Sequence, residues 1–476
     1  MSEEMPKSPF RDREQYEKTP LAEEMKAVLG MYELTRRLRA KNPDDPKDVD
    51  KAPEDIEESV GDHIAMTAYL MHYFLPLLEE QGVTLDYERV SDMILAHDIG
   101  HISNMSPVPA IQRTPEQKRE EIVGTAKIFG ELPRRDGFNR ALFDAYAEYI
   151  GQETPEARFV NALNGLETML YVLSRPPQLR KELVAGRGYA LEDYRERIAP
   201  FCREFPPIRE FYDRAERLFH RENYFAPSRV YENNVTRPDT MKNIFIQNGP
   251  EFGDLDNIDV NEENDRLLRL QRLKRKLRFG QAPKPHDEHH DTVAEHTSAL
   301  LFIKRYFLSS TANEVAQEQK QARVRRPRKS TQLDSRELNE IILAHDAPEA
   351  LTSDVITLSK TEARAVEEWD AGGDVEFDYA PRAARFNSKF GDRLEGYELD
   401  RTMPPFVGSA WFVKGLDMLE AQLYIFDRET RGKLSHMHVM SRDDVHKKAE
   451  PILQLFPTLE EHFDALEQKF REEGLP

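Results

Sequence analysis

The sequence contains a single cysteine, Cys202, among its 476 residues. One cysteine cannot form an intrachain disulfide, and it cannot supply the several thiolates of a cysteine-rich zinc module. Basic residues are also scarce relative to acidic ones, because 67 Lys and Arg stand against 87 Asp and Glu, which gives a formal charge of −20. A general nucleic-acid-binding protein needs a basic face, so this balance argues against a nucleic-acid partner.

Long apolar runs are missing as well. No stretch approaches the ~18 apolar residues of a membrane-spanning helix, and the first residues lack the apolar segment of a signal peptide. We therefore expect a cytoplasmic protein with no membrane partner. The sequence instead carries helical periodicity, with apolar residues three and four apart in 63–75, 160–174, 297–308 and 411–426, and it lacks convincing strand alternation. These patterns predict an all-α fold.

An internal repeat organises the chain. The segment Ile94-Leu-Ala-His-Asp98 recurs unchanged as Ile342-Leu-Ala-His-Asp346, and four further segments repeat in the same order around it. Five blocks in one order predict a tandem duplication. We expect an N-terminal tail at 1–20, a first helical unit at 21–225, an acidic linker at 226–264 and a second helical unit at 265–476. The two units would pack as a pseudo-dimer within one chain.

Each unit offers a His, then a His-Asp pair, then an acid or amide on a late helix. In the second unit these residues are His296, His345, Asp346 and Asp417. Imidazole nitrogens and carboxylate oxygens suit a divalent transition metal such as Mn, Fe, Co, Ni or Zn. Neighbouring residues on a straight helix point about 100° apart, so a His-Asp pair that binds one ion needs a helix end or a distortion.

These elements resemble the HD superfamily of metal-dependent phosphohydrolases, all-α domains whose ligands follow the order His, His-Asp, Asp. The second unit is similar to the 5′-deoxynucleotidase branch in four segments: Val293-Ala-Glu-His296, His345-Asp-Ala-Pro-Glu349, Leu351-Thr-Ser-Asp354 and Lys414-Gly-Leu-Asp417. The resemblance implies a divalent metal cofactor, for which Mg joins the ions named above, and a nucleotide substrate.

The resemblance also implies roles for single residues. Asp346 would serve in catalysis as a metal ligand, and Glu349 would handle the proton of the attacking water or the leaving oxygen. Arg278, at the end of a basic helix and followed by an aromatic residue, would grip the phosphate, and Asp354 would lie near the sugar. Lys414, one turn before Asp417, could also meet the phosphate as a point charge.

The first unit differs from the second at informative positions. It has His63, His97 and Asp98, but Asn164 stands where the second unit has Asp417, and His101 stands where it has Glu349. The element His97-Asp-Ile-Gly-His101 resembles HD branches that include deoxynucleotide triphosphohydrolases. Two interpretations stay open: a second site with altered chemistry, or a degenerate structural and regulatory copy. We favour the interpretation of the first unit as a degenerate copy, because the amide of Asn164 adds no negative charge for a metal.

The leading hypothesis is a metal-dependent phosphohydrolase that removes phosphate from a (deoxy)nucleoside 5′-monophosphate at the second unit. The alternatives are a hydrolase of a deoxynucleotide triphosphate or signalling nucleotide that uses the first unit, and a non-catalytic nucleotide-binding regulatory protein. The basic run at 323–329 is either a solvated loop or a flap for phosphate-bearing ligands.

Overall fold

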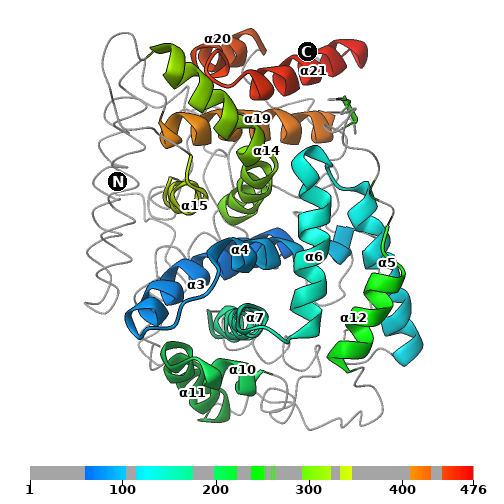
Figure 1. The fold of residues 1–476 in the computed structure, drawn as a ribbon, viewed down its shortest axis with the longest axis vertical. Helices are drawn as coiled ribbons and strands as arrows, with labels where there is room; N and C mark the ends of the chain where they lie inside the picture. The colour runs from blue at the N-terminus through cyan, green and yellow to red at the C-terminus, as the bar shows by residue number, and fades with distance from the viewer. Residues whose placement is uncertain are drawn as a thin grey trace, which may run out of the picture.

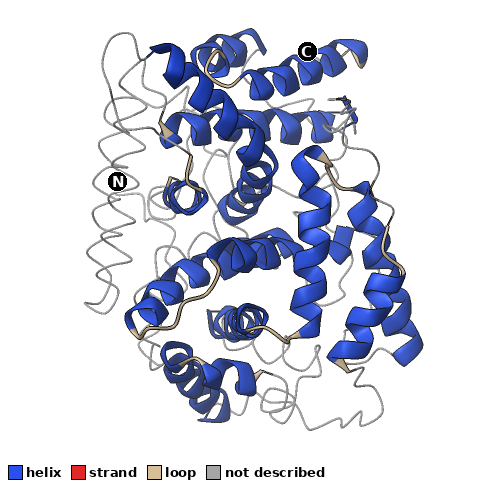
Figure 2. Ribbon diagram, viewed as in Figure 1, coloured by secondary structure: helices blue, strands red, loops and turns tan. Residues whose placement is uncertain are grey.

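The computed structural model describes residues 59–102, 114–174, 198–221, 237–250, 252, 259, 261–262, 292–322, 333–345, 408–429 and 442–474. Every regular element within these ranges is a helix, which confirms the predicted all-α fold (Figure 2). The helices are α3 (Val60–Glu80), α4 (Tyr87–Ala96), η2 (Ile99–Ile102), α5 (Pro115–Glu131), η4 (Arg135–Gly137), α6 (Phe138–Gly151), α7 (Pro155–Ser174), α10 (Ala199–Glu204), α11 (Pro206–Arg221), α12 (Pro238–Gln247), α14 (Val293–Ala322), α15 (Ser335–Ala344), α19 (Ser409–Glu429), α20 (Arg442–Leu453) and α21 (Pro457–Glu472).

The first-half helices α3 to α12 gather in the lower part of Figure 1, and the second-half helices α14 to α21 gather above them. The two groups meet chiefly where α14 packs against α3. One hydrophobic core runs through both groups, and it includes Tyr69 and Phe74 from α3 together with Phe302 and Tyr306 from α14. The halves therefore share buried surface and do not form separate cores.

Helices α3 and α14 begin in the same way. Ser59 accepts a hydrogen bond from the backbone N–H of Asp62 at 3.1 Å, and the Asp62 carboxylate accepts one from the Ser59 N–H at 2.8 Å. Thr292 and Glu295 repeat this reciprocal arrangement at 3.0 and 2.9 Å. Such a capping box fixes the first turn of a helix. It therefore sets the start of the helix that carries His63 or His296.

Helices α4 and α15 also match each other, since each has ten residues and an aspartate N-cap, Asp86 or Asp334. Each ends at an alanine, and the following histidine, His97 or His345, is the C-cap. His97 and His345 thus each lie at a helix end, which is one of the two arrangements that a His-Asp pair needs to bind one ion, while Asp346 lies outside the described residues. After His97 the chain continues into the 3₁₀ turn η2.

Helix α12 lies inside the range that the sequence predicts to be a linker. It packs against α5 and α6, and its buried Phe245 stacks on Phe143 with ring centroids 4.5 Å apart. Pro238 at the first turn starts the helix, and Met241, Ile244 and Phe245 supply an apolar face only one turn wide. Such a short face, beside an acidic and Asn-rich run, gives a weak periodic signal. The domain boundaries themselves stay predictions.

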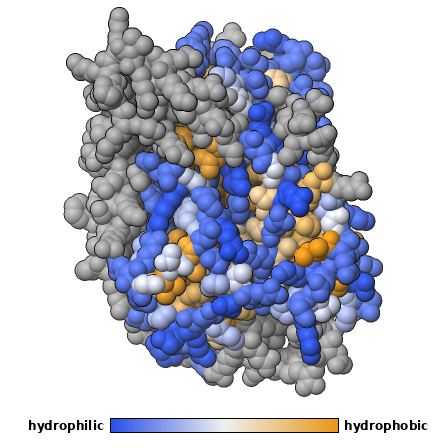
Figure 3. All heavy atoms as spheres, viewed as in Figure 1, coloured by the Kyte–Doolittle hydropathy of each residue, from blue (hydrophilic) through white to orange (hydrophobic). Residues whose placement is uncertain are grey.

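The face of the molecule visible in Figure 3 is mainly hydrophilic, with apolar residues in small separate areas. Ile246 on α12 is a large apolar side chain that stays 50% exposed. Among the described helices, none combines the length and hydropathy that a membrane span requires.

Candidate metal centres

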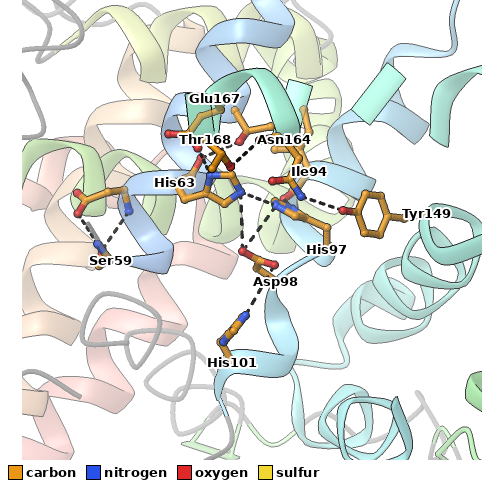
Figure 4. A network of polar contacts seen from close by, with 12 residues as sticks. Ser59, His63, Ile94, His97, Asp98, His101, Tyr149, Asn164, Glu167 and Thr168 are labelled. Carbon is orange, nitrogen blue, oxygen red and sulfur yellow. Dashed lines mark hydrogen bonds and ion pairs between the residues drawn. The ribbon is translucent and has the colours of Figure 1, made fainter. Parts of the chain in front are cut away.

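Two imidazoles and a carboxylate converge in the first half. His63 comes from the first turn of α3, His97 from the end of α4, and Asp98 follows directly (Figure 4). The Nε2 atoms of His63 and His97 lie 2.9 Å apart, and each lies 3.8 Å from Asp98 Oδ2. Both imidazoles are buried, whereas the Asp98 side chain is 19% exposed. The cluster therefore opens toward solvent on its carboxylate side.

The protonation of the two rings follows from their other nitrogen. His97 Nδ1 lies 2.7 Å from the Ile94 carbonyl oxygen, which can only accept, so Nδ1 carries the proton. His63 Nδ1 lies 2.6 Å from Glu167 Oε2 and donates to that carboxylate. In the neutral rings both Nε2 atoms then present lone pairs to the same point. Lone pairs at 2.9 Å repel each other unless a positive charge lies between or beside them.

This donor set fits a divalent cation. Two nitrogens bound at ~2.1 Å to one ion, at about a right angle, would lie ~3 Å apart, close to the separation of the two Nε2 atoms. One ligand atom from each of His63, His97 and Asp98 lies within 4.8 Å of the others. The carboxylate behind His63 is the kind of partner that orients imidazole ligands of metals.

Two further first-half residues from the sequence prediction lie at this cluster. His101 Nε2 is 3.9 Å from Asp98 Oδ1, so His101 lies beside the carboxylate on the 3₁₀ turn η2. Asn164, on α7, donates from Nδ2 to the Tyr149 hydroxyl at 2.9 Å, and the Tyr149 ring contacts the His97 ring edge-on (Figure 4). The Asn164 amide is thus held by a tyrosine that the sequence analysis did not single out.

The second half brings together the corresponding residues. His296 Nε2 lies 3.3 Å from Asp417 Oδ1, and the rings of His296 and His345 have centroids 5.7 Å apart. One ligand atom from each of these three residues lies within 4.8 Å of the others. His345 Nδ1 donates to the Ile342 carbonyl at 2.7 Å, as His97 does to Ile94. The second cluster therefore also fits a divalent cation.

Lys414 also lies at the second cluster. Its Nζ donates to Asp417 Oδ2 at 2.6 Å, and the two side chains are 14% and 12% exposed. The corresponding first-half residue, Asn161, instead donates to the Ala157 carbonyl at 2.8 Å on its own helix. A partly buried ammonium beside the ligand set leaves the second cluster less negative than its carboxylate alone would make it, which favours an anionic ligand nearby.

Glu167 and Glu420 are site residues that the sequence analysis did not assign. His296 Nδ1 lies 2.7 Å from Glu420 Oε2, which matches the contact of His63 with Glu167. Both glutamates are almost fully buried, at 2% and 0% exposure. A signal was present in the sequence, because a Glu follows three residues after Asn164 and again three residues after Asp417.

Four predicted site residues lie outside the described residues: Arg278, Asp346, Glu349 and Asp354. The tail at 1–20 and the basic run at 323–329 lie outside them as well. Their roles stay predictions.

A family model matches the part of the chain that contains the first-half His/Asp cluster. Residues 47–185 match the family model of the HD domain, so His63, His97 and Asp98 lie within that match. The chain is also similar to 5′-deoxynucleotidase HDDC2 of Danio rerio, with 26% identity over 139 residues. This alignment covers 28% of the chain and 65% of the relative, so the chain spans about two thirds of that protein's length. No solved structure gives a match.

Proposed function

We propose that this protein is a metal-dependent phosphohydrolase that removes phosphate from a (deoxy)nucleoside 5′-monophosphate at the second-half cluster. The observation that carries the proposal is the convergence of His296, His345 and Asp417, with the ring nitrogens fixed by Glu420 and Ile342. The HD-domain match, which covers residues 47–185 of the first half, supports the reaction class, and the name of the zebrafish relative, a 5′-deoxynucleotidase, supports the substrate class.

The chain's own residues divide the work. His296, His345 and Asp417 would hold the ion together with Asp346, and Glu420 keeps the His296 proton on Nδ1 so that Nε2 can bind. A bound divalent ion would lower the pKa of a water and polarise the phosphoryl group. Lys414 would offer a positive charge beside the substrate phosphate. By the resemblance to the deoxynucleotidase branch, Arg278 would bind the phosphate, Glu349 would handle the proton, and Asp354 would lie near the sugar.

Phosphate release from a panel of ribo- and deoxynucleoside monophosphates, with Mn²⁺, Co²⁺ or Mg²⁺ supplied, tests the proposal. We expect activity in the wild type and its loss in Asp346→Ala and in His345→Ala. His446→Ala is the matched control, because this half-buried histidine pairs with Glu467 on α21, outside both clusters. A metal-loaded wild type that releases no more phosphate than Asp346→Ala would sink the proposal.

A second candidate function uses the first-half cluster. The observation in its favour is the set of His63, His97 and Asp98, with His101 beside the carboxylate, within the range that matches the HD domain. This set would hydrolyse a deoxynucleotide triphosphate or signalling nucleotide. The products discriminate the two functions, because the second candidate requires tripolyphosphate or pyrophosphate in place of orthophosphate. It also requires loss of that product in His101→Ala but not in Glu349→Ala.

A further inference from the structure

The end of helix α15 is held by a side chain from the other half of the chain. The Tyr69 hydroxyl, on α3, donates a hydrogen bond to the carbonyl oxygen of Leu343, two residues before His345. The last four carbonyls of a helix have no partner within the helix, and that of Leu343 is one of them. Tyr69 is fully buried and Leu343 is 2% exposed, so water is excluded from this contact.

This contact acts on the turn that aims the His345 ring. His345 Nδ1 donates to the Ile342 carbonyl at 2.7 Å, and Tyr69 binds the very next carbonyl. Two successive carbonyls of the last turn of α15 thus have fixed partners, one of which is the ligand ring itself. Rotation of this turn would move His345 Nε2 away from His296 and Asp417.

Tyr69 makes this contact beside the second cluster, and the corresponding residue of α14 cannot make it beside the first cluster. Tyr69 lies six residues after His63, and the residue six positions after His296 is Phe302. Phenylalanine has no hydroxyl, so it cannot bind the Leu95 carbonyl, which precedes His97 as Leu343 precedes His345. The two matching segments therefore differ at this position, and the hydroxyl that is present serves the second cluster.

Other contacts anchor the same helix to the first half. Asn339, in the middle of α15, donates to the Tyr87 hydroxyl at 2.6 Å and to Ser91 Oγ at 3.2 Å. Arg336, one turn earlier, donates to Glu79 at 2.8 and 3.3 Å. Successive turns of α15 are thus bound to α3 and α4. The first half forms part of the support on which the second cluster is built.

Helix α14, which carries His296, is also anchored to the first half. The Thr292 hydroxyl, at its N-cap, donates to the carboxylate of Asp62 on α3. The backbone carbonyl of Thr292 accepts from the His296 N–H at 3.0 Å, so this anchor lies one turn from the ligand. His296 and His345 therefore both lie at helix ends that are hydrogen-bonded to first-half side chains.

We propose that Tyr69 is a positioning residue for the second metal centre, contributed by the first half of the chain. Its hydroxyl holds the last turn of α15 so that His345 and His296 present their Nε2 atoms to one ion. The first half then has a role in the second site that does not depend on its own chemistry. This inference rests on the metal centre of the proposed function and does not depend on which nucleotide is hydrolysed.

The test uses Tyr69→Phe in the full-length chain, which removes the hydroxyl and keeps the ring. Mn²⁺ affinity is measured by calorimetry in a His97→Gln background, so that the second cluster alone is titrated. We expect about tenfold weaker Mn²⁺ binding, in the range seen when outer partners of metal ligands are lost. At saturating Mn²⁺, we expect the KM for nucleotide to be unchanged.

Tyr73→Phe is the matched control, because Tyr73 lies one turn further on the same helix, is equally buried, and packs against Phe74 and Phe211 within the first half. We expect wild-type Mn²⁺ affinity from this variant. If the His97→Gln background does not fold, native mass spectrometry of the single variants at limiting Mn²⁺ counts the ions bound per chain, with one fewer expected for Tyr69→Phe.

Unchanged Mn²⁺ affinity in Tyr69→Phe would overturn the proposal, and so would an equal loss in both tyrosine variants. The binding measurement is independent of turnover. A wild type that binds Mn²⁺ tightly but releases no phosphate, together with a weakened Tyr69→Phe, would contradict the proposed function and leave the positioning role standing.

Discussion

Each cluster has a buried glutamate whose effect is exerted through an imidazole. Glu420 accepts the Nδ1 proton of His296, and Glu167 does the same for His63. A carboxylate in this place fixes the tautomer and raises the basicity of the opposite nitrogen, which strengthens its bond to a metal. Burial excludes the water that would otherwise compete for the Nδ1 proton. Removing the negative charge of either glutamate should therefore lower the metal affinity of its cluster.

Glu420→Gln tests this at the scale of one residue. The amide keeps an oxygen acceptor for the His296 proton but loses the negative charge, so we expect Mn²⁺ affinity to fall by about 10- to 100-fold with the fold retained. Calorimetric titration of the variant measures it. Glu467→Gln is the control, because Glu467 makes the same kind of contact with His446 Nδ1, and this pair lies outside both clusters. Equal affinities in Glu420→Gln and wild type would show that the charge is immaterial.

The sequence predicts most of the clustered His and Asp residues but not the buried residues that contact their far side. His63, His97, Asp98 and His296 are visible in sequence because the repeated motifs carry them in order. The sequence shows that Glu167 and Glu420 occupy matching positions, but it does not give their role, because the partner of Glu167 lies 104 residues away along the chain and a glutamate on a helix ordinarily points to solvent. Only the tertiary packing of α7 on α3 turns that glutamate inward.

At the scale of helices, long periodic stretches were predictable and helix-to-helix contacts were not. The patterns in 63–75 and 411–426 lie within α3 and α19, as expected. The sequence could not reveal that Lys304, on the predicted helix 297–308, is fully buried where α14 meets α4 and α15. Its Nζ donates to Ser335 Oγ at 2.9 Å, and Ser335 in turn donates to Glu88 at 3.1 Å.

Burial lowers the pKa of Lys304 to about 8, although the nearby carboxylates of Glu88, Asp92 and Asp334 act in the opposite direction and Arg305 adds to the lowering. The unfolded chain keeps the ordinary lysine pKa near 10.5. Between these two values the unfolded state binds more protons than the folded state. Stability from this group therefore rises as the pH rises from about 8 toward 10.5.

Lys304→Met tests this helix interface, and methionine is the residue that stands at the corresponding position of α3, Met71. We expect the unfolding free energy of wild type to rise relative to the variant by on the order of 2–3 kcal/mol between pH 7 and pH 10. Urea unfolding at four pH values measures the difference. The exposed Lys447→Met is the control and should show a constant difference. A flat difference for Lys304→Met would contradict the buried-charge assignment.

At the scale of the whole molecule, polar contacts as well as the shared hydrophobic core join the two halves. Arg305 on α14 pairs with Asp92 on α4 through two hydrogen bonds of 2.7 and 3.1 Å, and the side chains are only 17% and 13% exposed. Arg135 of the first half donates to the Tyr306 hydroxyl of the second at 3.2 Å. One core and several buried pairs across the halves favour a single cooperative unit.

The chain carries its own probes for testing this cooperativity. Both tryptophans, Trp369 and Trp411, belong to the second half, whereas the single thiol, Cys202, belongs to the first. Cys202 is fully buried on α10, and burial raises the pKa of its thiol, so it should not react with a disulfide reagent while the first half is folded. Fluorescence and thiol reactivity thus report on different halves.

We expect both probes to lose their native values at one urea midpoint. Arg305→Met leaves Asp92 largely buried without this partner, so it should lower the unfolding free energy by about 2–4 kcal/mol and shift both midpoints together. Arg89→Met is the control, because its pair with Glu148 lies within the first half and is 46% exposed on the arginine side, which limits the loss to about 1 kcal/mol. Separate midpoints for fluorescence and Cys202 reactivity in the wild type would mean that the halves unfold independently. A shift of the fluorescence midpoint alone in Arg305→Met would mean that the Arg305–Asp92 pair stabilises only the second half.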